Sequence, residues 1–427
     1  MSATRPVVGF VGMTHLGLVS ATGTAAKGFE VLGVDPDGDL IGRLRTGTLP
    51  VVEPDLPETI AANGARQRYS ADFADLAGCD VVYIAADVPT DDEGRSELSG
   101  IRALIGRVIP ALAPEAVLVV LCQVPPGFTR GLPLPAERLY YQVETLIFGR
   151  AVERATQPER FIVGCADPAR PLPAAFQAVL DGFGCPILPM RYESAELAKI
   201  AINVCLVASV SVANTLAELS EGIGADWHEI APALRLDRRI GAYAYLAPGL
   251  GIAGGNLERD LATVIRLADE RGTDAGVIEA FVRNSRRRRD WVLQVLERHV
   301  FPGRPDPLIA ILGLAYKVDT HSTKNSPALA LIRALPGRRL KVHDPVVREA
   351  DGLRSEASAL DAIAGADVLA VMTPWSEYRA LDPAAVCERL AGRWVIDPYG
   401  VFDARVMSGL GVDYATLGRP IEGGQDR

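Results

Sequence analysis

Two polar residues within a long apolar segment are the first candidates for chemistry. Lys199 and Asn203 lie four residues apart, so a helix through them places both side chains on one face. A lysine amine can act as a general base or stabilise an alkoxide electrostatically, and an asparagine can hold a water or a substrate hydroxyl. A buried polar contact between two helices is the alternative for this pair.

The segment around the pair predicts one helix over residues 193–221. Gly222 and Gly224 follow it, and glycine commonly ends a helix. Residues 200–217 carry no charge, but Asn203 and Asn214 lie among them. These amides would be costly in lipid, so we predict a buried helix and no membrane span.

A turn near the N-terminus is the candidate phosphate site. Residues 7–11 are apolar and β-branched, as in a strand, and residues 16–27 are small helix formers that end at Gly28. Between them lies a turn that starts at Gly12 and ends at Gly17. Helix N–H groups at such a turn attract a pyrophosphate, so the spacing is typical of dinucleotide binding.

An acidic residue selects among dinucleotides. Asp35 closes the next predicted strand, residues 30–34, where a carboxylate binds ribose hydroxyls and repels a 2′-phosphate. We therefore predict NAD and not NADP. Thr14 stands where such loops usually have glycine, so its Cβ is expected to push the cofactor outward or weaken its binding. A structural unit without cofactor is the alternative.

Strand-like and helical runs alternate along the rest of the chain. Runs at 81–85, 117–122 and 161–163 predict a parallel sheet covered on both faces. After three linker prolines, runs at 308–312, 340–343, 368–372 and 394–396 predict a second sheet. The predicted fold is α/β, with two Rossmann-like doubly wound domains (1–190 and 301–427) joined by a long central helix and a helical middle domain (191–300).

Composition excludes several functions. A net charge of −9 argues against general affinity for nucleic acid or anionic lipid, and the run Arg286–Arg289 is expected on a solvated helix face or a subunit contact. Six cysteines form no close-spaced metal pattern, as expected of reduced thiols in a cytoplasmic protein. The glycines of 249–254 spell GxGxxG without a leading strand, so we predict a flexible loop there and no second NAD site.

The order of motifs resembles the UDP-glucose/GDP-mannose dehydrogenase family over nearly the whole chain. The resemblance implies NAD, a nucleotide-sugar substrate on the second Rossmann-like unit, and a homodimer built by the long helix. The motifs are Gly12–Gly17, Glu53-Pro54, Pro89-Thr90 with Asp92 and Gly94, Val124-Pro125-Pro126-Gly127, Glu144, Glu196, Lys199, Asn203, Asn214, Arg239-Ile240-Gly241, the loop 248–255, Gly313-Leu314-Ala315-Tyr316-Lys317, His343-Asp344-Pro345 and Thr373-Pro374-Trp375.

The resemblance also implies site residues. Arg239 matches an arginine that reaches the neighbouring subunit's substrate, Asp260 is expected to orient Lys199, and Glu144 is expected to support the same water. The cofactor residues are Gly12, Thr14, His15, Leu16, Gly17, Asp35, Pro89, Thr90 and Gln123. The substrate residues are Glu144, Lys199, Asn203, Arg239, Tyr243, Gly251, Gly255, Tyr316 and Lys317.

One position departs from the family's chemistry. The family oxidises a primary alcohol twice through a cysteine thiohemiacetal and thioester, and Asn256 occupies that cysteine's position. An amide is not a useful nucleophile. Cys205 points about 200° around the helix from Asn203 and is not expected to substitute. Arg259 replaces a lysine, and Gln123 replaces a threonine.

Three functions remain open. The first is a single two-electron oxidation of a hydroxyl on a nucleotide sugar or nucleoside. The second is an epimerase that oxidises transiently and retains NAD. The third is a catalytically silent homologue that binds a nucleotide sugar. Acid formation without the thiol is a smaller possibility. The altered segment after Glu144 and the loss of an arginine after Asp397 suggest a substrate other than UDP-glucose.

Overall fold

The computed structural model describes residues 5–89, 91 and 96–423. The chain forms two compact units, Met1–Ile202 and Asn203–Arg427. Thr90, Asp92 and Gly94 lie outside the described residues.

The first unit is built on an eight-stranded sheet of order β3-β2-β1-β4-β5-β6-β7-β8. All neighbouring strands run parallel except β6 and β7, which are antiparallel because the chain turns back after β6 instead of crossing over. The predicted α/β class is confirmed with that one departure. The strands are β1 (Val7–Val11), β2 (Glu30–Val34), β3 (Gln67–Ser70), β4 (Val81–Ile84), β5 (Val117–Val120), β6 (Leu139–Gln142), β7 (Phe161–Cys165) and β8 (Ile187–Arg191).

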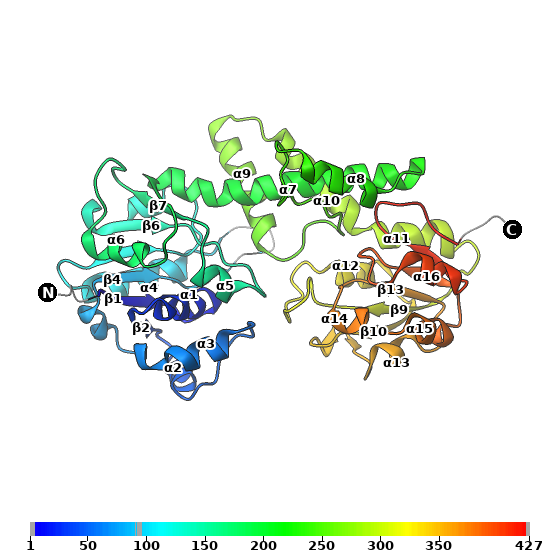
Figure 1. Ribbon diagram of the computed structural model, residues 1–427, viewed down its shortest axis with the longest axis horizontal. Coiled ribbons are helices and arrows are strands. Elements are labelled where there is room, and N and C mark those ends of the chain that lie inside the picture. Colours follow the sequence, from blue (N-terminus) through cyan, green and yellow to red (C-terminus); the bar gives the residue numbers. More distant parts are fainter. Residues whose placement is uncertain (1–4, 90, 92–95, 424–427) are drawn as a thin grey trace. The chain divides into compact units, whose positions relative to one another are not determined.

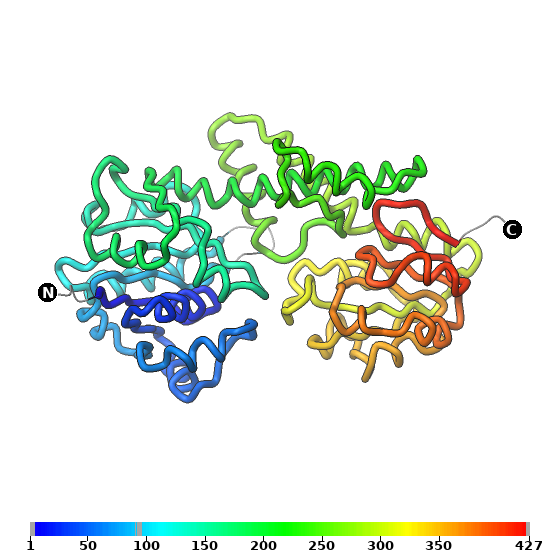
Figure 2. The backbone as a smooth tube through the Cα atoms, in the orientation of Figure 1, coloured from blue at the N-terminus to red at the C-terminus, as the bar shows by residue number. Residues whose placement is uncertain are grey.

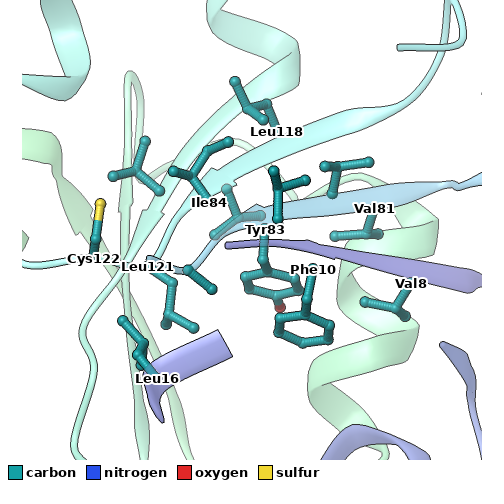
Figure 3. Close-up of a cluster of buried hydrophobic side chains, with 14 of the residues drawn as sticks. Val8, Phe10, Leu16, Val81, Tyr83, Ile84, Leu118, Leu121 and Cys122 are labelled. Carbon is teal, nitrogen blue, oxygen red and sulfur yellow. The ribbon is translucent and has the colours of Figure 1, made fainter. Parts of the chain in front are cut away.

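Helices cover this sheet. Every residue of β4 and β5 is buried, so both faces of the sheet centre are covered, as for a parallel sheet. Figure 3 shows part of this core, where the rings of Phe10 and Tyr83 stack with centroids 4.8 Å apart. The helices are α1 (His15–Ala26), α2 (Gly38–Arg45), α3 (Leu56–Asn63), α4 (Ser99–Val108), α5 (Ala151–Thr156), α6 (Ala174–Asp181) and the start of α7 (Tyr192–Ile223) (Figure 1).

In the second unit, helices precede a smaller sheet along the chain. Figure 2 traces its backbone from green to red. The rest of α7 is followed by α8 (Trp227–Leu236), α9 (Asn256–Arg271), α10 (Gly276–Arg289) and α11 (Trp291–Val295). The parallel sheet has the order β10-β9-β13-β14-β15. Its strands are β9 (Leu308–Leu312), β10 (Arg339–His343), β13 (Val368–Val371), β14 (Trp394–Ile396) and β15 (Asp413–Ala415).

Short elements complete the second unit, and its predicted strands are all present. A separate two-stranded ribbon pairs β11 with β12. The remaining elements are β11 (Glu349–Ala350), β12 (Leu353–Arg354), α12 (Pro327–Ala334), α13 (Ala359–Ile363), α14 (Ser376–Arg379), α15 (Pro383–Arg389) and α16 (Ala404–Gly409).

The arginine run of α10 serves helix packing. Arg287 binds Glu218 of α7, and Arg288, which is 1% exposed, contacts Glu218 and Glu221. The prediction of a solvated face or subunit contact is therefore wrong for Arg288, because its charge is matched inside the unit.

Helix α7 is the one helix of the described residues that is long and apolar enough to cross a membrane by length and composition. The core helix of a soluble protein passes the same test.

Candidate functional site

The turn after β1 has the geometry of a phosphate loop. Gly12 has φ +96°, and a Cβ on it would lie 2.5 Å from that of Ala86. A Cβ on Gly17 would lie 1.8 Å from the carbonyl oxygen of Gly12, so helix α1 can begin this close to the strand only with glycine there. The predicted strand–turn–helix is confirmed.

The start of α1 fits a dinucleotide. Within the described part of the chain, the backbone N–H groups of His15, Leu16 and Gly17 have no acceptor, and no side chain caps the helix. Asp35 is buried after β2, where one oxygen accepts the N–H of Met13 at 2.7 Å and the other accepts that of Asp37 at 2.9 Å. Donors for a pyrophosphate and an acceptor for ribose hydroxyls therefore lie at one edge of the sheet.

Thr14 has a bonding role that the sequence did not indicate. Its hydroxyl accepts the N–H of Asp87 at 2.9 Å, which ties the phosphate loop to the segment after β4. Its φ of −76° is ordinary for a side-chain residue. That its Cβ displaces the cofactor remains a prediction.

His15 is held in a buried cluster at the first turn of α1. Its Nε2 lies 2.9 Å from Glu53, whose other oxygen accepts the N–H of Ala151 at 2.8 Å. The ring of Phe148 stacks on the imidazole with centroids 4.1 Å apart. The segment between β6 and α5 is thereby fixed to the helix that begins at the phosphate loop.

The start of the same segment, at Glu144, binds Lys199. Lys199 Nζ donates to a carboxylate oxygen of Glu144 at 3.0 Å and to its backbone carbonyl at 2.9 Å, and both side chains are largely buried. The second carboxylate oxygen accepts the N–H of Leu146. Glu144, which was expected to support a water, thus binds Lys199 directly. That Asp260 orients Lys199 stays a prediction.

Asp260 binds Asn203 in the second unit. The amide of Asn203 donates to it at 2.5 Å, and the guanidinium of Arg259 lies 3.7 Å from its other oxygen. Asp260 and Arg259 are both buried. The predicted site residues Asn203 and Asp260 are thus brought together, as an amide–carboxylate pair.

The glycine-rich loop forms hydrogen bonds along its length, and its predicted flexibility stays a prediction. It contains Gly251 and Gly255 and leads to Asn256, which is exposed at the first position of α9. The bonds are Gly249 N–H to Asn214 Oδ1 at 2.8 Å, Ile252 N–H to Ser285 Oγ at 2.7 Å, Gly254 N–H to the Lys324 carbonyl at 3.1 Å and Asn325 Nδ2 to the Gly254 carbonyl at 2.9 Å.

The predicted platform residues of the second sheet lie beside this loop. A Cβ on Gly254 would be 3.0 Å from the ring of Tyr316, so the loop packs closely on that tyrosine. Lys317 Nζ lies 5.9 Å from the centroid of the same ring. Burial raises the pKa of Tyr316, so its hydroxyl stays protonated at neutral pH.

Asp344, the acidic residue after the second strand of the second Rossmann-like unit, is buried and fully hydrogen-bonded. Asp344 has 0% exposure and its oxygens accept five N–H groups, so it has little capacity left for a ribose. This supports a nucleotide-sugar platform over a second NAD site. The donors are the backbone of Leu314 at 2.7 Å, Ala315 at 3.0 Å, Val346 at 2.9 Å and Val347 at 2.8 Å, and the indole of Trp375 at 3.2 Å.

Five further site residues were predicted from the sequence. Arg239 is exposed and binds Asp237 at 2.6 Å, and Tyr243 is 96% exposed. Pro89 is exposed, and its carbonyl accepts the N–H of Glu97. Gln123 follows β5 and is partly buried, and Thr90 lies outside the described residues.

Two glutamates of the first unit were not predicted as site residues. Glu53 binds His15, and Glu196 accepts two N–H groups of the loop after β5. The available signal for Glu196 was its place three residues before Lys199 on the same predicted helix, in a stretch that also carries Glu193.

Comparison with known proteins identifies each part of the chain. Residues 7–179 match the NAD binding domain of the UDP-glucose/GDP-mannose dehydrogenase family, residues 193–286 match its central domain, and residues 310–404 match its UDP binding domain. A UDP-glucose 6-dehydrogenase of Pseudomonas aeruginosa is 29% identical over 447 residues, with 97% of each chain covered. One of Bacillus subtilis is 27% identical, with 97% of this chain and 93% of the relative covered.

Solved structures agree. The UDP-glucose dehydrogenase of Pyrobaculum islandicum superposes with a TM-score of 0.82 at 27% identity, covering 95% of this chain and 96% of that one. A UDP-D-ManNAc dehydrogenase of Pyrococcus horikoshii has a TM-score of 0.83 at 21% identity over 97% of this chain and 99% of its own, which shows the fold alone. The cofactor is NAD, and the class is that of the nucleotide-sugar dehydrogenases. The chain therefore belongs to the UDP-glucose/GDP-mannose dehydrogenase family.

Proposed function

We propose that this protein performs a single two-electron oxidation of a hydroxyl on a nucleotide sugar or nucleoside and stops at the carbonyl. The observation that carries the proposal is Asn256, exposed at the start of α9 where the family's chemistry requires a thiol. An amide cannot form the thiohemiacetal through which an aldehyde is oxidised further. Cys205, the cysteine nearest in sequence to Asn256, lies on α7. It follows Asn203 by two residues, so its side chain faces away from that of Asn203.

The remaining polar pairs suffice for one oxidation. NAD, when held at the loop after β1, would supply the acceptor for a hydride that leaves the carbinol carbon. The amine of Lys199, when neutral, takes the hydroxyl proton, and the carboxylate of Glu144 at 3.0 Å stabilises the ammonium that results. Asn203, fixed by Asp260 at 2.5 Å, presents its amide oxygen as an acceptor for a substrate hydroxyl or a water. One C–H bond and one O–H bond break, and a carbonyl forms.

Two other functions use the same pairs. An epimerase would return the hydride to the opposite face and retain its NAD, so it would release no NADH. A silent homologue would bind a nucleotide sugar on the Tyr316–Lys317 side of the second unit and transfer no hydride. Both are outcomes of the same experiment.

The experiment incubates the purified protein with NAD and a panel of nucleotide sugars and nucleosides. The proposal expects NADH formation with at least one substrate and a product lighter by two hydrogen atoms. Product isomers without NADH would indicate the epimerase, and binding without turnover would indicate the silent homologue. A carboxylate product would overturn the proposal.

We further propose that the protein is a cytoplasmic homodimer. Val212, Leu216, Leu219 and Ile223 are exposed, and their spacing of four, three and four places them in one stripe of α7. Such a stripe suits a second copy of this helix. The exposed Arg239 would then be available to a neighbouring subunit. Analytical ultracentrifugation should give twice the mass of one chain, and the variant Leu219→Asp should shift the measured mass towards that of a single chain.

The cytoplasmic location is supported by the cysteines. All six are free, as suits a reducing compartment.

A further inference from the structure

A buried carboxylate joins the first turns of α7 to the loop after β5. Glu196 has 0% exposure, and its two oxygens accept the N–H of Gly127 at 2.5 Å and that of Thr129 at 2.9 Å. Both donors lie in the segment that follows β5. A buried carboxylate is costly unless it is bonded, so these N–H groups are what keeps it in place.

The sheet order shows which half of NAD faces this segment. Asp35, the ribose acid, follows β2, and the strand order reverses between β1 and β4. A dinucleotide lies across that reversal, with its adenosine on the β1–β2 side. The carboxyl ends of β4, β5 and β6 are therefore left for the nicotinamide half, and the loop held by Glu196 leaves one of them.

Glu196 also lies one turn before Lys199 on the same helix. Lys199 binds Glu144, which follows β6, whereas Glu196 binds the segment that follows β5. The first turns of α7 thus bind two neighbouring loops at the carboxyl edge of the sheet, the loop after β5 through Glu196 and the loop after β6 through Lys199. Because both side chains belong to one helix, their positions relative to each other are fixed.

We propose that Glu196 is a positioning residue, which holds the 124–129 loop against the nicotinamide half of NAD at a fixed height relative to Lys199. It touches no reacting atom in this role. Burial raises the pKa of Glu196, and the N–H groups of Thr129 and Gly127 oppose that shift, in keeping with a carboxylate kept for its bonds.

The test uses Glu196→Gln, which keeps the size of the side chain. An amide offers one oxygen, and its NH2 would face the second backbone N–H, donor against donor. We expect the Kd of NAD to rise about tenfold, as for the loss of one hydrogen bond to a charged group, while the Kd of ADP-ribose, which lacks nicotinamide, changes less than about twofold. Amide exchange at Gly127 and Thr129 should speed up.

The matched control is Glu193→Gln. Glu193 lies one turn earlier on the same helix and binds Arg130 of the same region, but both side chains are half exposed. This variant should alter neither affinity. Because calorimetric titration with NAD and ADP-ribose needs no substrate, the result is independent of the proposed single oxidation.

Equal loss of both affinities in Glu196→Gln would mean a general structural role and would overturn the proposal, and so would no change in either. Glu196→Asp withdraws the charge by one methylene and should show the same selective loss. It decides the question if the glutamine variant does not fold.

Discussion

Asp344→Asn is the substitution that best separates the two Rossmann-like units. Asp344 and Asp35 occupy the same place after the second strand of each unit, and each accepts the N–H that follows the turn glycine, at 2.7 Å in both cases. Asp344 accepts four further N–H groups, whereas Asp35 accepts one. We therefore expect Asp344 to act in stability alone and Asp35 to act in cofactor binding.

The magnitude follows from the donors. In Asp344→Asn an NH2 group replaces one of the two carboxylate oxygens. If it replaces the first oxygen, the N–H groups of Val346 and Val347 lose their acceptor. If it replaces the second, the three N–H groups bound there lose theirs, so at least two bonds are lost in either case. Hydrogen bonds to a buried charged group contribute about 1.5–3 kcal/mol each, so the loss should be about 3–6 kcal/mol.

Intrinsic fluorescence reports this loss directly. All four tryptophans, at 227, 291, 375 and 394, lie in the second unit, and Trp375 itself binds Asp344. The fluorescence transition in urea should move to lower denaturant in Asp344→Asn. The Kd of NAD, measured below that transition, should stay within about twofold of the parent value.

Asp35→Asn is the matched control. It should raise the Kd of NAD at least tenfold, by about 1.5–3 kcal/mol, because a ribose acceptor is lost, and it should leave the tryptophan transition in place. The reasoning is refuted if Asp344→Asn weakens NAD binding without moving that transition.

Three further predictions concern the first unit. Asp55 has φ +62°, which strains a residue with a side chain, so Asp55→Gly should raise the free energy of unfolding by about 0.5–1 kcal/mol in a urea titration. The control Asp37→Gly should lower it, because Asp37 has an ordinary φ of −80° and its side chain makes two capping bonds. Glu144→Gln and Lys199→Ala should each lower kcat about 100-fold, and the double variant little more, since they act as one unit; additive losses would count against the pair. Arg130 holds the pKa of Glu193 at about 2, so their coupling should shrink as pH falls from about 4.5 towards 2; a coupling unchanged at pH 3 would contradict this.

The sign of the last prediction follows from linkage. The folded pKa of Glu193 is depressed by its bond to Arg130, so the stabilisation is complete above the unfolded value and is lost as the carboxylate is protonated. The coupling is measured by a double-mutant cycle in urea at pH 6 and pH 3.

Strand and helix positions were predictable where one pattern dominates. The apolar runs of β1, β9 and β13 were predictable because burial on both faces of a sheet requires continuous apolar residues. The long helix α7 was predictable from its uncharged middle and from the glycines that follow it. The edge strands β3 and β8 were not predicted, because one or both of their faces carry polar or exposed residues. The antiparallel β6–β7 pair depends on how the chain returns, which no local pattern specifies.

The partners of the predicted site residues could not be read from the sequence. Lys199 and Asn203 lie on one helix as predicted, but the bonds from Lys199 to Glu144 and from Asn203 to Asp260 were not predicted. Which acid meets which donor depends on tertiary placement, and sequence spacing fixes only neighbours within one element. The bonds of Glu196 could not be predicted for the same reason, since its donors Gly127 and Thr129 lie on a segment distant in sequence.

The number of NADH molecules formed per substrate molecule tests the central claim most directly. With NAD in excess and a limiting nucleotide sugar that the protein oxidises, we predict one NADH per substrate and a carbonyl product that a hydrazine reagent traps. The number of NADH formed per substrate should be measured for the parent protein and for the variant Asn256→Cys under identical conditions. Two NADH per substrate and a carboxylate product from the parent protein would contradict the account.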